Sequence, residues 1–147
     1  MVTGVKQNTI VRSLRPLLVG DHIYKNQDPS TVAELLIRYW KAIGDLWPNA
    51  VHSDSREEYS LMKSVGVLTM HSIAPTIFEA ARANSGKITQ DLLRQILEPV
   101  AKKLTIEFWN SKTGEAGKVG TNNKAVRYLS DQVLKYIQPG QFADSLL

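Results

Sequence analysis

Apolar residues recur along this chain at steps of three and four, the spacing that places side chains on one face of an α-helix. The pattern is clearest after Asp28, a favourable N-cap, and Pro29, which suits a first helical turn. It ends at Trp47, because a residue that precedes a proline avoids the helical region. The apolar face of this predicted helix consists of Val32, Leu36, Tyr39, Ile43 and Leu46, widened by Leu35 and Trp40.

The same spacing predicts further helices over residues 9–19, 56–83, 89–109 and 123–137. Thr89 is a good N-cap, and Gly66 within the second of these ranges indicates close helix–helix contact. Pro75 and Pro99 interrupt two patterns, since proline lacks the N–H of a helical hydrogen bond. Residues 104–108 also alternate apolar and polar, which is typical of a short strand, but we favour helix there.

These patterns predict an all-α fold, a compact bundle of five to six helices, two of them kinked or broken at Pro75 and Pro99. Residues 9–138 are expected to form a single α-helical domain, between a flexible arm over 1–8 and a flexible tail over 139–147. A length of 147 residues is sufficient for one hydrophobic core.

Composition narrows the class of protein. The apolar fraction of 43% and the charged fraction of 22% are ordinary for a soluble globular domain. The chain has no cysteine, which excludes disulfides, thiolate catalysis and cysteine-ligated metal sites. No apolar run approaches the roughly 20 residues that cross a bilayer, and the first residues lack the apolar core of a signal peptide. We therefore expect a cytoplasmic protein with no membrane partner.

The most informative segment follows Phe108-Trp109 and covers residues 110–124, directly before the last predicted helix. Glycines at 114, 117 and 120 are interspersed with lysines, and glycine lets backbone approach a ligand closely. A helix start also offers free N–H groups to an anion. The spacing matches neither a dinucleotide-binding fingerprint nor a P-loop. The expected nucleic-acid-binding residues are Lys112, Lys118, Asn122, Asn123, Lys124 and Arg127, with Trp109 as a base-stacking platform. The alternative is a solvated loop whose asparagines cap the helix.

The net charge of +4 is mild, but its distribution supports this interpretation. Residues 101–147 hold seven basic side chains against four acidic ones, and residues 1–27 hold four against one. The middle of the chain is close to neutral.

Candidate catalytic chemistry is sparse. His22, His52 and His71 show no metal-ligand spacing, and His71 lies in an apolar helix, which favours a core or interface residue. Glu57 and Glu58 are adjacent, so their carboxylates diverge on a helix. We predict no catalytic residue, no metal and no cofactor, and favour a non-enzymatic role over an enzyme. The tryptophans at 40 and 47 are expected to pack in the core.

Several short motifs resemble a known family. The runs over 37–48 and 61–67, together with Phe108-Trp109 and the glycine-rich segment, are similar to the C-terminal helical region of DGQHR-domain (DndB-like) proteins. The resemblance covers roughly residues 30–137, and the Asp-Gly-Gln-His-Arg signature is absent, so no active-site residue carries over. It implies a context of bacterial or phage DNA modification, defence or its regulation, with DNA and a ParB-like domain as partners.

Together, these features predict a non-enzymatic accessory domain that binds nucleic acid, with DNA favoured, through backbone phosphates. The alternative is a helical assembly module that packs on another protein or forms a homo-oligomer without binding nucleic acid. That alternative rests on the abundance of apolar residues in the ranges 28–47 and 56–83.

Overall fold

Every secondary-structure element described in the computed structural model, which covers residues 29–137, is helical. Within this range no strand forms, and the one β-contact is an isolated antiparallel bridge between Tyr59 and Asn110. The prediction of an all-α fold is therefore confirmed. The α-helices are α3 (Pro29–Leu46), α4 (Pro48–Val51), α5 (Ser64–Ser85), α6 (Gln90–Lys103), α7 (Glu115–Lys118) and α8 (Asn123–Lys135), with 3₁₀ turns η2 (Arg56–Glu58) and η3 (Ile106–Trp109). The predicted helix over 9–19 and the two predicted flexible ends lie outside the described residues.

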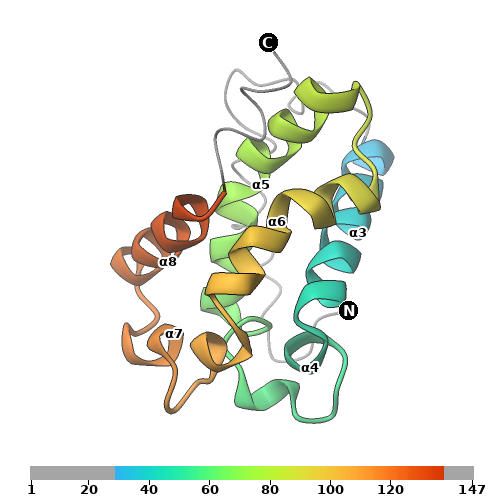
Figure 1. Cartoon of the computed structure of the whole chain (residues 1–147). Helices are drawn as coiled ribbons and strands as arrows, with labels where there is room; N and C mark the ends of the chain where they lie inside the picture. The colour runs from blue at the N-terminus through green and yellow to red at the C-terminus, as the bar shows by residue number, and fades with distance from the viewer. Residues whose placement is uncertain (1–28, 138–147) are drawn as a thin grey trace.

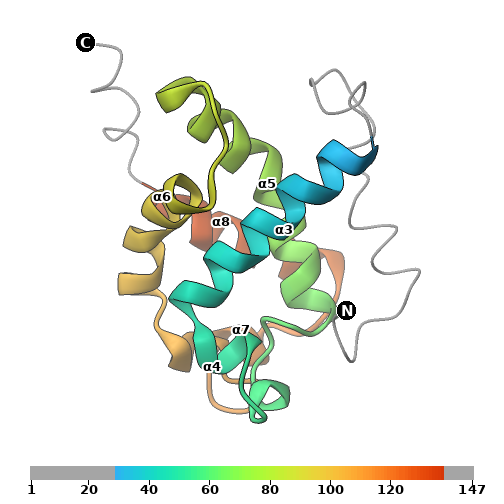
Figure 2. The same cartoon turned by 90° about the vertical axis from the view of Figure 1, so that its right-hand side faces the viewer.

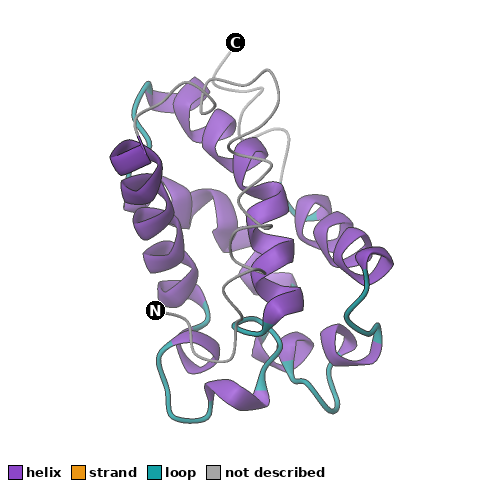
Figure 3. Ribbon diagram, turned by 180° about the vertical axis from the view of Figure 1, so that it is seen from behind, coloured by secondary structure: helices purple, strands orange, loops and turns teal. Residues whose placement is uncertain are grey.

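The four long helices form the body of the fold. Helix α6 packs along α3, and α5 packs against both α6 and α8 (Figure 1). Figure 2 shows α3 crossing α5, and Figure 3 shows α8 beside α5 from behind. The short elements α4, η2, η3 and α7 contact one another at one end of this bundle (Figure 1). That end contains most of the glycine-rich segment.

Aromatic side chains from α3 organise the core. Tyr39 is fully buried, packs edge-on against Phe78 at 5.4 Å between ring centroids, and donates its hydroxyl to the Met70 carbonyl at 2.7 Å. Half-buried Trp40 donates its indole N–H to His71 Nε2 at 2.8 Å. These contacts join α3 to the middle of α5, and they confirm the predicted packing role of Trp40.

His71 is a core residue, as its apolar surroundings in the sequence indicate. Its side chain is 5% exposed, and burial lowers the pKa of the imidazole to about 4. The ring that accepts the Trp40 N–H is therefore neutral near pH 7.

Helix α5 begins later than the sequence predicts. The pattern placed its start near Arg56, but residues 56–58 form the separate turn η2 and the helix begins at Ser64. Gly66 permits this arrangement, since a Cβ there would meet the carbonyl oxygens of Ser60 and Leu61. The glycine allows the approaching segment, and not a neighbouring helix, to pass close to the first turn of α5.

Pro75 and Pro99 end no helix. Pro75 lies within α5 and Pro99 within α6, and both helices continue past them, so neither helix is broken. The predicted helix across 89–109 instead ends at Lys103, and residues 106–109 form the 3₁₀ turn η3. The strand considered over 104–108 does not form either. The predicted N-cap Thr89 is confirmed, since it caps α6 by accepting from the Leu92 N–H at 3.2 Å, whereas the predicted N-cap Asp28 lies outside the described residues. Gly86 ends α5 with φ of 76°.

Candidate nucleic-acid interface

The segment over 110–124 is folded and is not an open loop. The Asn110 side chain accepts the N–H groups of both Lys112 and Thr113 at 2.9 Å. Four residues then form α7, and the Asn122 side chain accepts the Ala125 N–H at 2.9 Å, which caps α8. These local hydrogen bonds hold the segment at the end of the bundle.

Two of the three glycines in this segment serve packing within the chain. A Cβ at Gly114 would meet the carbonyl oxygens of Glu107 and Phe108, and a Cβ at Gly117 would meet that of Ser111. Gly120 differs, because its φ is 91° and its surroundings are open. The expectation that all three glycines let backbone approach a ligand is therefore wrong for the first two, since other parts of the chain occupy that space.

Pairing with residues before α5 fixes this segment in place. Ser60 N–H donates to the Trp109 carbonyl at 2.6 Å, and Ser111 donates its N–H and its hydroxyl to the Glu58 carbonyl at 2.8 and 2.9 Å. These bonds flank the Tyr59–Asn110 bridge. The end of the molecule formed by α7 and the start of α8, which we call the α7–α8 corner, consequently forms one surface with the start of α5.

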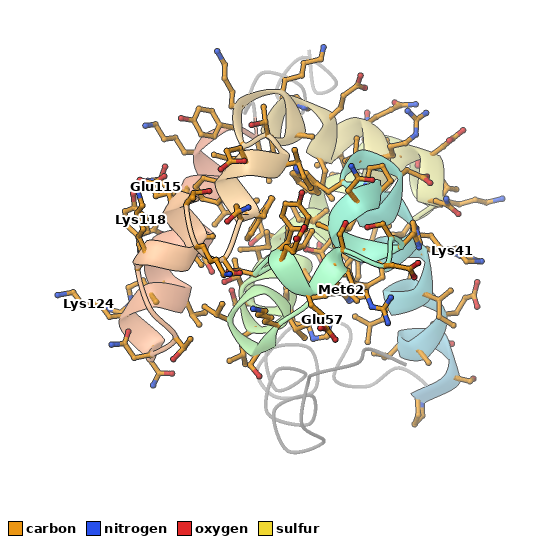
Figure 4. All side chains as sticks on the ribbon, turned by 90° about the horizontal axis from the view of Figure 1, so that it is seen from below. Lys41, Glu57, Met62, Glu115, Lys118 and Lys124 are labelled. Carbon is orange, nitrogen blue, oxygen red and sulfur yellow. The ribbon has the colours of Figure 1, made fainter. Side chains whose placement is uncertain are left out.

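The predicted cationic residues of this corner are exposed. No described carboxylate forms an ion pair with any of them; the ion pairs in the described range join Arg38 to Glu34 and Arg94 to Asp91. Figure 4 shows Lys118 and Lys124 on the same side of the molecule, with Glu115 beside Lys118, and Lys41 on the opposite side. The cationic residues are Lys112, Lys118, Lys124 and Arg127.

The nearby carboxylates have partners within the protein. Glu115 accepts the Tyr128 hydroxyl at 2.6 Å, a contact that joins α7 to α8 and raises the pKa of that hydroxyl. Glu107 accepts the Thr113 hydroxyl. Both carboxylates thus receive a hydroxyl hydrogen bond, and Glu115 lies beside Lys118 (Figure 4).

Asn122 and Asn123 are both predicted to bind nucleic acid, with helix capping as the alternative, and their side chains differ in the structure. Asn122 uses its side-chain oxygen as the N-cap of α8, as the alternative of a capped helix expected. Asn123 is the first residue of α8 and is exposed, with no side-chain hydrogen bond to a described residue. It keeps a polar side chain available at the surface.

Trp109 cannot act as a stacking platform. Its side chain is fully buried, edge-on against Trp47 at 5.9 Å and Phe108 at 5.0 Å between ring centroids. Trp47 also donates its indole N–H to the Leu104 carbonyl at 2.8 Å, while Trp109 Nε1 has no acceptor among the described residues. The prediction of base stacking on Trp109 is wrong because the 3₁₀ turn η3 points this ring into the core.

Sequence reasoning missed a cleft of about 540 Å³ beside this corner. It lies between the start of α5 and the α7–Thr121 segment, and we call it the α5 cleft. Its lining includes Arg56, Ser60, Lys63, Ser64, Gly117 and Thr121. The sequence pattern predicts a continuous helix across 56–83, in which Ser64 lies mid-helix. It therefore gives no indication of the helix N-terminus that borders this cleft.

The remaining surface offers little to an apolar partner. In residues 29–137 the large apolar side chains classed as exposed are Ile37 and Tyr128, at 48% and 37%. The apolar residues of α3 and α5 that suggested an assembly module are mainly used in the core.

The described range also holds no cluster of three histidine or carboxylate side chains able to bind a metal ion, and none of its helices has the length and apolarity of a membrane span.

No family model, curated protein or solved structure matches the chain.

Proposed function

We propose that this chain is a non-enzymatic accessory domain that binds nucleic acid, with DNA favoured, through backbone phosphates. The observation that carries the proposal is the set of exposed cations at the α7–α8 corner, Lys112, Lys118, Lys124 and Arg127, none of them paired with a described carboxylate. Such side chains bind phosphates in a manner that is independent of base sequence.

The arrangement at this corner supports contact with an extended polyanion. Lys124 and Arg127 are three residues apart on α8 and therefore lie on neighbouring turns of one face. Lys118 ends α7 on the same side of the molecule (Figure 4). The N-terminus of α8 contributes the positive end of its dipole at the same place.

The resemblance to DGQHR-domain proteins supplies a context for this proposal. It suggests a cytoplasmic role in bacterial or phage DNA modification, defence or its regulation, with a ParB-like domain as a partner. The assembly alternative has less support, since the described surface shows no large apolar patch.

The salt dependence of DNA binding tests the proposal. Binding of a fluorescent 20-base-pair duplex should weaken linearly as salt rises on a log–log scale, because phosphate contacts release counterions. The double variant Lys118→Gln, Lys124→Gln should reduce that slope by about two, roughly one for each phosphate contact.

The matched control is the double variant Lys41→Gln, Lys87→Gln. Both lysines line a shallow groove between α3 and the start of α6, and Lys41 lies on the opposite side from Lys118 (Figure 4). The control should bind with the wild-type slope. Absence of DNA and RNA binding at low salt, or equal losses in the two double variants, would refute the proposal.

A further inference from the structure

The N-terminus of α5 opens into the α5 cleft without a side-chain cap. Lys63 is the N-cap residue and provides no capping hydrogen bond, and the first helical amide bond runs from Val67 N–H to the Lys63 carbonyl at 2.9 Å. The N–H groups of Ser64, Val65 and Gly66 therefore have no acceptor among the described residues. In a 22-residue helix these groups carry the positive end of the helix dipole.

The Ser60 hydroxyl in the same cleft has no hydrogen-bond partner among the described residues. Ser60 lines the cleft and is only 4% exposed, while its backbone N–H and carbonyl bond to Trp109 and Lys63. Its hydroxyl forms no hydrogen bond with any residue of the described range. This hydroxyl is not among the fully enclosed side-chain polar atoms that lack a partner, so it keeps access to the cleft and can donate to an acceptor that enters there.

Charge and shape define which acceptor suits the cleft. Arg56 and Lys63 line it, against the single carboxylate of Glu57. Figure 4 shows Glu57 and Met62 at this end of the molecule. Apolar atoms of Met62, Val65 and Ala116 form another part of the lining, and the volume of about 540 Å³ lies in the range of small-ligand pockets. The cleft can therefore hold an anionic group and an attached, less polar group together.

We propose that the α5 cleft binds a phosphomonoester that carries such an attached group. The phosphate would accept from the first-turn amides of α5 and the Ser60 hydroxyl, near the cations of Lys63 and Arg56. The source is either the terminal nucleotide of a nucleic-acid strand or a free nucleoside monophosphate. This site uses residues other than those of the α7–α8 corner, so it does not rest on the proposed function.

Titration with adenosine monophosphate, followed by calorimetry and by amide NMR signals, tests this site. The nucleotide should bind at least about tenfold more tightly than adenosine and should shift the Ser64 and Val65 amide signals. Lys63→Met should weaken binding about tenfold and Ser60→Ala about fivefold, the losses expected for one charged and one neutral hydrogen bond. Lys63 is exposed, so its replacement should leave the fold intact.

The control is Lys87→Met, an exposed lysine in the groove between α3 and α6, which should keep wild-type affinity for the nucleotide. Equal binding of adenosine and its monophosphate, no binding of either, or equal effects of the two lysine variants would overturn the proposal. Short strands with and without a 5′-phosphate then identify the source: preference for the phosphorylated strand indicates a strand end, and equal binding indicates a free nucleotide. Loss of this site would leave the salt dependence carried by Lys118 and Lys124 unchanged.

Discussion

Mild acid should destabilise this fold through His71. The imidazole is buried on α5, and its Nε2 accepts the Trp40 N–H from α3 at 2.8 Å. Protonation at Nε2 would remove that hydrogen bond and place a positive charge in the core. Burial accordingly lowers the pKa of His71 to about 4 in the folded state.

The size of the effect follows from the difference in pKa between the two states. The unfolded imidazole titrates near 6.5 and the folded one near 4, so the unfolded state takes up the proton first as pH falls. The stability that neutral His71 provides is complete above pH 6.5 and is lost between about 6.5 and 4. At ~1.4 kcal/mol per pKa unit, the full loss is ~3 kcal/mol, of which ~2.5 kcal/mol is lost by pH 4.5. Since small domains are stable by only about 5–15 kcal/mol, this loss should be large.

Urea unfolding of the wild type and of His71→Gln at pH 7 and pH 4.5 measures this contribution. Glutamine can accept the Trp40 N–H but does not titrate, so subtracting the two pH dependences removes the contribution of the carboxylates. The wild type should lose ~2.5 kcal/mol more than the variant between these two pH values. The His71 ring signal in NMR should titrate near pH 4. Equal pH dependence in the two proteins, or a ring midpoint near 6.5, would refute the reasoning.

Three further substitutions test local features of the candidate site. Asn122→Ala should lower the free energy of unfolding by about 1 kcal/mol through loss of the α8 cap, whereas Asn123→Ala should change it by less than about 0.5 kcal/mol. Equal effects of the two variants in urea unfolding would contradict the assigned cap. Gly117→Ala should cost about 1–3 kcal/mol, because the new Cβ would meet the Ser111 carbonyl, and an unchanged urea midpoint would refute that packing role. Trp109→Phe should lower the thermal midpoint but leave affinity for DNA unchanged, since the ring is buried; a large loss of affinity at matched stability would restore the stacking hypothesis.

The long helices could be predicted because their signals are local. The apolar stripe of α3, the Thr89 cap and the Asn122 cap each depend on residues that are close together in the sequence. These three helices begin where the pattern predicts them, although α6 ends at Lys103 and α8 at Lys135, both earlier than predicted. The exposure of Lys118 and Lys124 could be anticipated for the same reason, since lysine beside glycine and asparagine is typical of surface segments.

The residues between those helices could not be predicted in the same way. The turn η2 and the late start of α5 depend on hydrogen bonds such as Ser111 to Glu58, which join residues 53 positions apart. The local spacing of apolar residues does not depend on such contacts, so the apolar pattern that begins at residue 56 predicts a continuous helix. The burial of Trp109 has the same origin, because Trp47 covers it from another part of the chain. The α5 cleft could not be predicted for the same reason, because it forms between residues 56–65 and 111–121, which are distant in sequence.

The central claim is that nucleic acid binds the α7–α8 corner, and the most direct measurement is an NMR titration of the ¹⁵N-labelled chain with duplex DNA at low salt. The account predicts shifts centred on Lys118, Lys124 and Arg127, which disappear as salt is raised. Shifts centred on Lys41 and Lys87 instead, or none at all at low salt, would contradict it.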